Sequence, residues 1–235
     1  MNIIIEKLLS RIPGTLSNKR RNFLLDYDKK RLSNHKEIFL SIARFGQINR
    51  PFEGFYFEFG CHGGNTIKLA WQNFRFIFDL DYVCFDSFEG LPEISKIDRQ
   101  KIWQKGKLRT TLDEFFHILK KIGLPLNKVK IIKGFYKESL NKQLQEDLLP
   151  KKAAVIYVDC DLYESTKEVL EFCVPFFREG TILIFDDWNC FNGSPEKGER
   201  KAFGEFIAAH ESLKFEDFIS TNEQKGFICI SKSHD

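Results

Sequence analysis

Residues 154–166 read AVIYVDCDLYEST, and this stretch decides the fold. An uninterrupted apolar run, Ala154–Val158, is followed at once by acidic residues and then by a helical pattern. A strand that is apolar on both of its faces is typical of a parallel sheet covered by helices on both sides. Four more runs of this kind, separated by helical patterns, lie at Phe55–Phe59, Tyr82–Phe85, Val129–Ile132 and Thr181–Phe185. The sequence therefore predicts a doubly wound α/β fold.

The two ends of the chain follow other patterns. The runs Phe215–Ile219 and Phe227–Ile230, separated by a polar stretch, predict an antiparallel hairpin that completes the sheet. The first fifty residues are helical and charged, with a candidate cap at Ser33 or Asn34. We therefore expect residues 1–50 to form an N-terminal helical segment and residues 51–235 to form the main domain.

Two helices of the main domain carry a candidate start signal. Thr111 with Glu114, and Ser165 with Glu168, each match the capping-box pattern ahead of an apolar stripe. We therefore expect one helix to begin after Thr111 and another after Ser165.

Composition restricts the kind of protein and its compartment. The 235 residues are 43% hydrophobic with a net charge of +3, which argues against disorder and against a nucleic-acid partner. No stretch approaches the roughly 20 apolar residues of a membrane helix, and the apolar start Met1–Ile5 is too short for a signal sequence. The six cysteines form no C-x-x-C pair. These features predict a cytoplasmic protein without a membrane span.

A glycine-rich turn follows the first predicted strand, with the sequence EFGCHGGNT at residues 58–66. Glycines there let the backbone turn tightly and approach a ligand, and the next helix offers free N–H groups. The spacing Gly60-x-x-Gly63-Gly64 does not match a phosphate-binding Rossmann loop. An acidic residue beside the glycines favours a cationic or hydroxyl-bearing ligand over a phosphate. Without other motifs, a turn that binds no ligand is also compatible with this pattern.

Acidic residues follow three other predicted strands. Asp86 ends the second strand, where an acid is well placed to accept hydrogen bonds from ribose hydroxyls, or simply caps the next turn. Asp159 and Asp161 follow the fourth strand, and Asp186-Asp187 follow the fifth. Carboxylates that converge in one crevice repel each other unless a cation lies among them, and oxygen ligands suit Mg²⁺. The alternatives are that Asp161 caps a helix and Asp187 pairs with a surface arginine.

Four strings together resemble the macrocin O-methyltransferase (TylF/MycF/NovP-like) family. They are EFGCHGG at 58–64, FDSFEGLP at 85–92, VDCDLYEST at 158–166 and IFDDW at 184–188, and their order and spacing match over roughly residues 53–230. The resemblance implies a Rossmann-like class I methyltransferase fold with S-adenosyl-L-methionine as donor. It also implies Mg²⁺ or another divalent cation held by Asp159, Asp186 and Asp187, and a small acceptor whose sugar hydroxyl is methylated.

The remaining roles follow from the place of each residue in these strings. For the donor we expect binding by one set of residues near the first two strand ends: Glu58, Gly60, Gly64, Asn65, Thr66, Asp86 and Ser87. For the general base the candidates are Asp161, His62 and Asp159, in that order. The N-terminal segment either covers the acceptor pocket, forms a contact between copies of the chain, or is a plain surface helix. The lysine-rich residues 93–110 match nothing in the family pattern.

Two other functions are compatible with parts of this pattern. A metal-dependent phosphoesterase also uses paired acidic clusters, but it needs neither the glycine turn nor Asp86. A catalytically silent binding module retains the fold without the reaction. Binding of S-adenosylhomocysteine separates the transferase from the phosphoesterase, and methyl transfer to any acceptor excludes the silent module.

Overall fold

The computed structural model describes residues 15–232 and contains one seven-stranded sheet with the strand order β3-β2-β1-β4-β5-β7-β6. The first five strands are parallel, whereas β7 pairs antiparallel with both β5 and β6. The strands are β1 (Gly54–Phe59), β2 (Leu80–Asp86), β3 (Val129–Lys133), β4 (Ala153–Val158), β5 (Ile182–Phe185), β6 (Leu213–Ser220) and β7 (Lys225–Lys232). The predicted parallel sheet with a C-terminal hairpin is confirmed.

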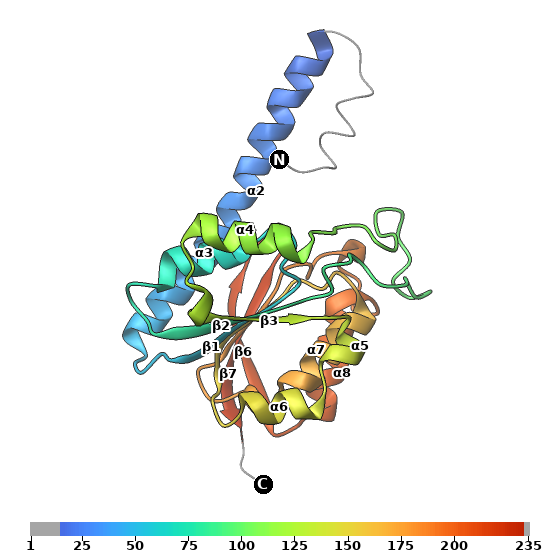
Figure 1. Cartoon of the computed structure of the whole chain (residues 1–235). Helices are drawn as coiled ribbons and strands as arrows, with labels where there is room; N and C mark the ends of the chain where they lie inside the picture. Colours follow the sequence, from blue (N-terminus) through green and yellow to red (C-terminus); the bar gives the residue numbers. More distant parts are fainter. Residues whose placement is uncertain (1–14, 233–235) are drawn as a thin grey trace.

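Helices cover both faces of this sheet (Figure 1). Packing places α2, α3 and α4 on one face and α6, α7 and α8 on the other. The helices are α2 (Thr15–Ile48), α3 (Asn65–Phe74), α4 (Leu112–Ile122), α5 (Tyr136–Ser139), α6 (Lys142–Leu148), α7 (Tyr163–Cys173) and α8 (Gly198–Ala209). Three short 3-10 turns, η1 (Leu126–Lys128), η2 (Val174–Phe176) and η3 (Phe191–Gly193), complete the described chain.

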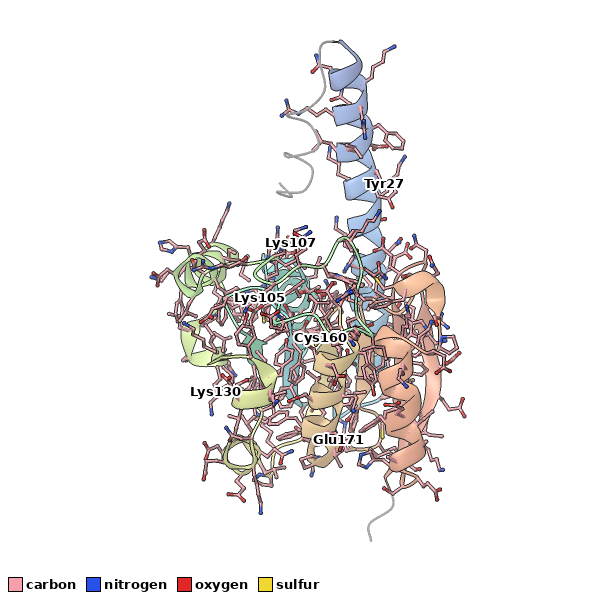
Figure 2. All side chains as sticks on the ribbon, turned by 90° about the vertical axis from the view of Figure 1, so that its right-hand side faces the viewer. Tyr27, Lys105, Lys107, Lys130, Cys160 and Glu171 are labelled. Atoms are coloured by element: carbon pink, nitrogen blue, oxygen red, sulfur yellow. The ribbon has the colours of Figure 1, made fainter. Side chains whose placement is uncertain are left out.

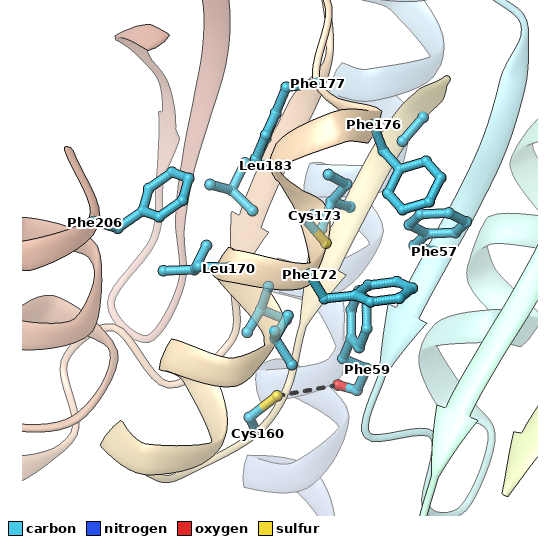
Figure 3. Packing of buried hydrophobic residues seen from close by; sticks show 14 of the residues in the cluster. Phe57, Phe59, Cys160, Leu170, Phe172, Cys173, Phe176, Phe177, Leu183 and Phe206 are labelled. Atoms are coloured by element: carbon cyan, nitrogen blue, oxygen red, sulfur yellow. Dashed lines mark hydrogen bonds between the residues drawn. The ribbon is translucent and has the colours of Figure 1, made fainter. Parts of the chain in front are cut away.

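Aromatic side chains fill the core on both sides of the sheet. Because successive residues of a strand point to opposite faces, Phe57 and Phe59 of β1 pack toward α7, and Tyr56 packs toward α2 and α3. Figure 3 shows Phe57 and Phe59 beside Phe172 and Phe176, with the Cys160 thiol directed at the Phe59 carbonyl. This packing holds the ends of β1 and β4 in a fixed position.

The helix starts agree with the sequence in one case and differ in another. Thr111 and Glu114 form the predicted capping box at α4. The predicted box at Ser165 is wrong, because α7 already begins at Tyr163 and its flanking residue provides no side-chain cap. Instead, the buried carboxylate of Asp98, far away in the sequence, accepts the Tyr163 N–H at 2.8 Å. The cap is a tertiary contact, so no local pattern marks it.

Helix α2 is longer than the sequence pattern indicates. It runs through the predicted cap at Ser33 and Asn34 without interruption, and the Ser33 hydroxyl donates back to the Lys30 carbonyl. Its second half is buried through Ile38, Phe39 and Ile42, whereas its first half extends away from the sheet (Figure 1). The helical part of the 1–50 segment thus contributes to the core of the main domain. Residues 1–14 of that segment lie outside the described residues.

Candidate active site

The four strand ends that carry the motifs lie next to one another, at the carboxyl-terminal ends of the parallel strands. Phe59 of β1 is in register with Phe85 of β2 on one side and with Val158 of β4 on the other, and Val158 is in register with Phe185 of β5. The turns that follow these residues therefore share the carboxyl edge of the parallel strands, where ligands of open α/β sheets bind.

The glycine turn needs its glycines for close approach within the protein. Gly60 has φ +88°, and a Cβ there would lie 1.8 Å from the Asp159 carbonyl oxygen. Gly64, which precedes α3, has φ +66°, and its Cβ would lie 2.7 Å from the Ile118 side chain. Any side chain at Gly60 would push apart the ends of β1 and β4. These contacts bring the predicted donor turn against the first acidic residue of the β4 end.

Asp86 ties the glycine turn to the end of β2. Its Oδ2 accepts the N–H groups of Cys61 at 2.9 Å and of His62 at 3.1 Å, and its Oδ1 accepts the Phe88 N–H at 2.7 Å. The neighbouring Ser87 hydroxyl donates to the Gly90 carbonyl at 2.8 Å within the same turn. Asp86 therefore lies against the predicted donor turn, with its carboxylate already surrounded by N–H donors.

Glu58 is buried in the protein interior. Its carboxyl group accepts the Tyr56 hydroxyl at 2.5 Å and the Thr66 hydroxyl at 2.7 Å, and the Ile67 N–H also bonds to it. Burial raises the pKa of Glu58 to about 7 against the opposing effect of these bonds. This carboxyl group joins β1 to the first turn of α3. Glu58 and Thr66 are therefore buried and hydrogen-bonded to each other.

Two more predicted residues flank the turn. Asn65 is exposed on the first turn of α3. His62 is half-buried with φ +29°, and its Nδ1 lies 3.1 Å from the Thr110 hydroxyl. This contact joins the glycine turn to residues 93–110, which we call the strap and which connect the β2 turn to α4.

After the ends of β4 and β5, three acidic side chains come together. One carboxylate oxygen from each of Asp159, Asp161 and Asp187 lies within 4.8 Å of the other two. Burial and the neighbouring carboxylates raise the pKa values of Asp159 and Asp187 well above their usual range. Burial also raises the pKa of Asp161, to about 6. We call these three residues the acidic trio.

Asp186, a predicted metal ligand, is not one of the three residues of the trio, although its charge also raises the pKa of Asp159. Its Oδ1 lies 3.0 Å from His35 Nε2 of α2, accepts the Tyr157 hydroxyl, and accepts the Gln224 amide at 3.3 Å. Burial opposes its ionisation, but His35, Tyr157 and Gln224 together hold the pKa of Asp186 below its usual value. Consecutive residues at a strand end point to opposite faces, so Asp186 contacts α2 whereas Asp187 faces Asp159 and Asp161.

The strap supplies a partner for the trio that the motifs do not indicate. Trp103 is buried, and its indole N–H donates to Asp161 Oδ1 at 2.9 Å. The Trp103 ring lies 4.7 Å from the Phe191 ring in the turn after β5. The only sequence signal is one tryptophan in a lysine-rich stretch, and it gives no hint of its partner.

Glu199 is another contributor that sequence reasoning missed. It lies in the first turn of α8, is 1% exposed, and accepts the Asp187 N–H through Oε2 at 2.9 Å. Its Oε1 has no hydrogen-bond partner among the described residues. Burial and the charges of Asp187, Asp186 and Asp161 raise the pKa of Glu199 well above its usual value. Glu199 thus fixes the backbone of one trio residue.

The acidic trio has the chemistry of a divalent metal site. Its donors are all carboxylate oxygens, which Mg²⁺ and similar cations prefer. The groups face one another, and a cation among them would remove the repulsion that raises their pKa values. The residues present therefore fit such an ion.

The chain belongs to a known family of methyltransferases by sequence. The profile of the macrocin O-methyltransferase (TylF) family matches residues 29–213, which is most of the chain. Strands β1 to β5 and the four motif turns described above lie within this range. The resemblance recognised in the sequence is therefore confirmed.

Individual relatives are more distant. The chain is 32% identical over 109 residues to the 8-demethyl-8-(2,3-dimethoxy-alpha-L-rhamnosyl)-tetracenomycin-C 4'-O-methyltransferase of Streptomyces olivaceus, a match that covers 44% of this chain and 40% of that protein. The solved structure of the O-methyltransferase NovP superposes with a TM-score of 0.66 at 20% identity, covering 86% of this chain and 80% of NovP. Calicheamicin methyltransferase CalS11 gives 0.66 at 22% identity, covering 95% and 89%. These two structures establish a Rossmann-like methyltransferase fold. Within residues 15–232, no helix has the length and apolar character needed to cross a membrane.

Proposed function

We propose that this protein transfers a methyl group from S-adenosyl-L-methionine to a sugar hydroxyl of a small glycan or natural product, with Mg²⁺ or a similar cation at the acidic trio. The observation that carries the proposal is the meeting, at one sheet edge, of the glycine turn and three mutually facing aspartates. Family membership and the similarity to the Streptomyces 4'-O-methyltransferase of a rhamnosyl-tetracenomycin support the acceptor class.

The donor would lie along the glycine turn. Its methyl group is carried on a positively charged sulfonium, so a site with carboxylates suits this donor better than a phosphate-binding site does. Asp86 at the end of β2 is the proposed partner of the ribose hydroxyls, while Gly60 and Gly64 let the turn pack closely against Asp159 and Ile118. Asn65 and Ser87 are proposed to line the cleft from α3 and from the β2 turn. Glu58 and Thr66 would act indirectly, by fixing the start of α3.

The acceptor hydroxyl would lie at the acidic trio. A bound divalent cation lowers the pKa of a hydroxyl group and directs its oxygen toward the methyl group. Asp159 and Asp187 belong both to the predicted ligand set and to the trio, so we propose both as ligands. Asp161 and Asp186 compete for the third position. Asp161 faces the other two, whereas Oδ1 of Asp186 is engaged by His35.

A base must take the proton of the acceptor hydroxyl, a contribution of about 10²–10⁴-fold. Asp161 is our first candidate because its pKa, raised by burial to about 6, is close to neutral pH and Trp103 fixes its orientation. His62 is the second candidate, and Thr110 holds its ring on the donor side of the site. Asp159 is the third candidate, in the role of a ligand that also accepts a proton.

The deciding experiment combines donor binding with methyl transfer. Calorimetric titration with S-adenosylhomocysteine should give a Kd on the order of micromolar, and methyl-labelled donor should label a panel of glycosides. Removal of divalent ions should stop the transfer and Mg²⁺ should restore it. Absence of donor binding would point instead to a phosphoesterase, and donor binding without transfer to any acceptor would point to a silent module.

We also propose a cytoplasmic location. No disulfide joins any of the six cysteines within residues 15–232, and five of them are buried, which suits a reducing compartment. Assembly into a homo-oligomer through the projecting half of α2 is a further proposal, and sedimentation of the purified protein would test it.

A further inference from the structure

A pocket of about 420 Å³ opens beside the acidic trio, between the strap and the turn that follows β5. One of its walls reaches the trio directly, because the Cys190 thiol donates to Asp187 Oδ1 at 3.2 Å. The pocket is lined by Gln100, Asn189, Cys190, Phe191, Asn192 and Lys197. It is therefore placed to hold the part of an acceptor that extends away from the reacting hydroxyl.

The walls of this pocket are fixed to the site by several contacts. The Phe191 ring packs against Trp103, whose N–H in turn binds Asp161. Asn189 is held by the Arg200 guanidinium at 2.5 Å. Because the same side chains hold both the pocket and the trio, a group bound in the pocket has a defined position relative to the carboxylates.

The chemistry of the lining favours a polar ligand without positive charge. Gln100, Asn189 and Asn192 carry amides, which both donate and accept hydrogen bonds as sugar hydroxyls require. Lys197 contributes an exposed ammonium group, which only donates and attracts anions. No carboxylate is among the six lining residues.

The strap, which contributes Gln100 to the pocket, carries a concentration of positive charge. Its 18 residues include six lysines and arginines but only two acidic residues, in a chain with a net charge of only +3. Both acids are already engaged, since Asp98 is buried at the start of α7 and Glu93 pairs with Lys105 at 2.5 Å. The remaining exposed cations form no salt bridge within residues 15–232: Lys96, Arg99, Lys101, Lys107 and Arg109. Figure 2 shows Lys105 and Lys107 on the strap, well apart from Lys130.

We propose that the acceptor is a sugar that carries an anionic group, a phosphate or a carboxylate, bound by Lys197 and the strap. This inference rests on the proposed function and narrows its substrate class. The sugar ring would contact the amides, its reactive hydroxyl would face the trio, and its anion would face Arg99, Lys101 and Lys197. Exposed cations that form no salt bridge within residues 15–232 attract an anionic ligand, whereas a neutral sugar gains nothing from their charge.

The test measures binding of simple probes to protein dialysed free of divalent ions, so that a phosphate has no metal to bind. Glucose 1-phosphate, glucuronate and glucose are titrated separately by calorimetry in the presence of S-adenosylhomocysteine. We expect at least one anionic sugar to bind at least about tenfold more tightly than glucose, with binding weakened by salt. The tighter of the two anionic probes identifies phosphate or carboxylate as the group recognised.

The variant Arg99→Gln/Lys101→Gln/Lys197→Gln should weaken binding of the anionic sugar about tenfold, since three exposed cations contribute modestly each. The matched control Lys120→Gln/Lys121→Gln/Lys130→Gln removes the same charge elsewhere and should stay within about twofold. Equal binding of glucose, no binding of either anionic sugar, or equal weakening in the control would overturn the inference. Titration of S-adenosylhomocysteine alone keeps the two proposals separable, because its failure would contradict the proposed function.

Discussion

The carboxylates at the ends of β1 and β2 and the carboxylates that follow β4 and β5 differ in what surrounds them. Asp86 and Glu58 accept hydrogen bonds from backbone N–H groups and hydroxyls. Asp159, Asp161 and Asp187 face one another instead. A carboxylate surrounded by donors stabilises the fold as it stands, whereas facing carboxylates require a proton or a cation. The comparison separates acids whose charge is already stabilised by hydrogen bonds within the protein from acids whose mutual repulsion is not.

The largest expected effect comes from removing one of the facing acids. Asp187→Ala should lower metal-dependent turnover by at least about 100-fold, because the divalent cation loses a ligand. Magnesium titration should lose its heat signal, while affinity for S-adenosylhomocysteine should change by no more than about twofold. Asp217→Ala, which removes an exposed carboxylate on β6, is the control. Turnover that persists in Asp187→Ala would exclude the trio as the metal site.

The opposite result is expected for an acid surrounded by donors. Glu58→Ala leaves the Tyr56 and Thr66 hydroxyls and the Ile67 N–H without a partner in the core, which should cost about 3 kcal/mol of unfolding free energy. Urea denaturation measures this loss. Glu58→Gln retains a hydrogen-bonding group of the same size and should cost less than about 1 kcal/mol. Similar stabilities for both variants would show that the hydrogen bonds of Glu58 are unimportant.

The pH dependence of metal binding should also distinguish the facing acids of the trio from the acids that accept hydrogen bonds. Burial raises the pKa of Asp161 to about 6, and burial and like charges raise those of Asp159 and Asp187. A cation must displace these protons, so Mg²⁺ affinity should rise from pH 5.5 to pH 8 by about tenfold or more. Calorimetry in buffers of different ionisation enthalpy should detect proton release. An affinity independent of pH would mean that the trio is fully ionised before the metal binds.

A smaller effect is expected at the residue that supports the trio from behind. Glu199→Leu removes the acceptor of the Asp187 N–H and should weaken Mg²⁺ binding about tenfold. Glu199→Gln keeps a carbonyl acceptor at that place and should restore binding to within about threefold. Comparison of the two Mg²⁺ affinities checks the role. If both variants lose stability without any change in metal affinity, Glu199 has a purely structural role.

The smallest effect is expected within the glycine turn. Cys61 is buried, and its thiol contacts the Cys84 thiol and makes long contacts to the Glu58 and Phe85 carbonyls, at 3.6 and 3.8 Å. Cys61→Ser keeps a donor of similar size, so activity should stay within about twofold and stability within about 1 kcal/mol. Labelled methyl transfer and thermal melting measure the two quantities. A large loss of activity would assign Cys61 a direct part in donor binding.

Strand order along the chain, the turn after each strand and the identity of the motif residues could be predicted from the sequence. Continuous apolar runs such as Ala154–Val158 are typical of a strand buried on both faces, and two apolar runs around a polar stretch after Leu213 are typical of a hairpin. The capping box at Thr111 is local, so it could be predicted as well. Parallel strands share one carboxyl edge, which explains why the acidic motifs meet.

The tertiary structure alone decided which aspartate faces which partner. Asp186 and Asp187 are neighbours in the chain, yet the first meets His35 of α2 and the second joins Asp159 and Asp161. Likewise, the strap placed Asp98 at the start of α7 and Trp103 on Asp161, across 58 positions or more. Sequence patterns show which residues of a single helix or strand are buried and which are exposed. The direction of a side chain at a strand end and the partner supplied by a distant loop depend on packing between elements, which no local pattern contains.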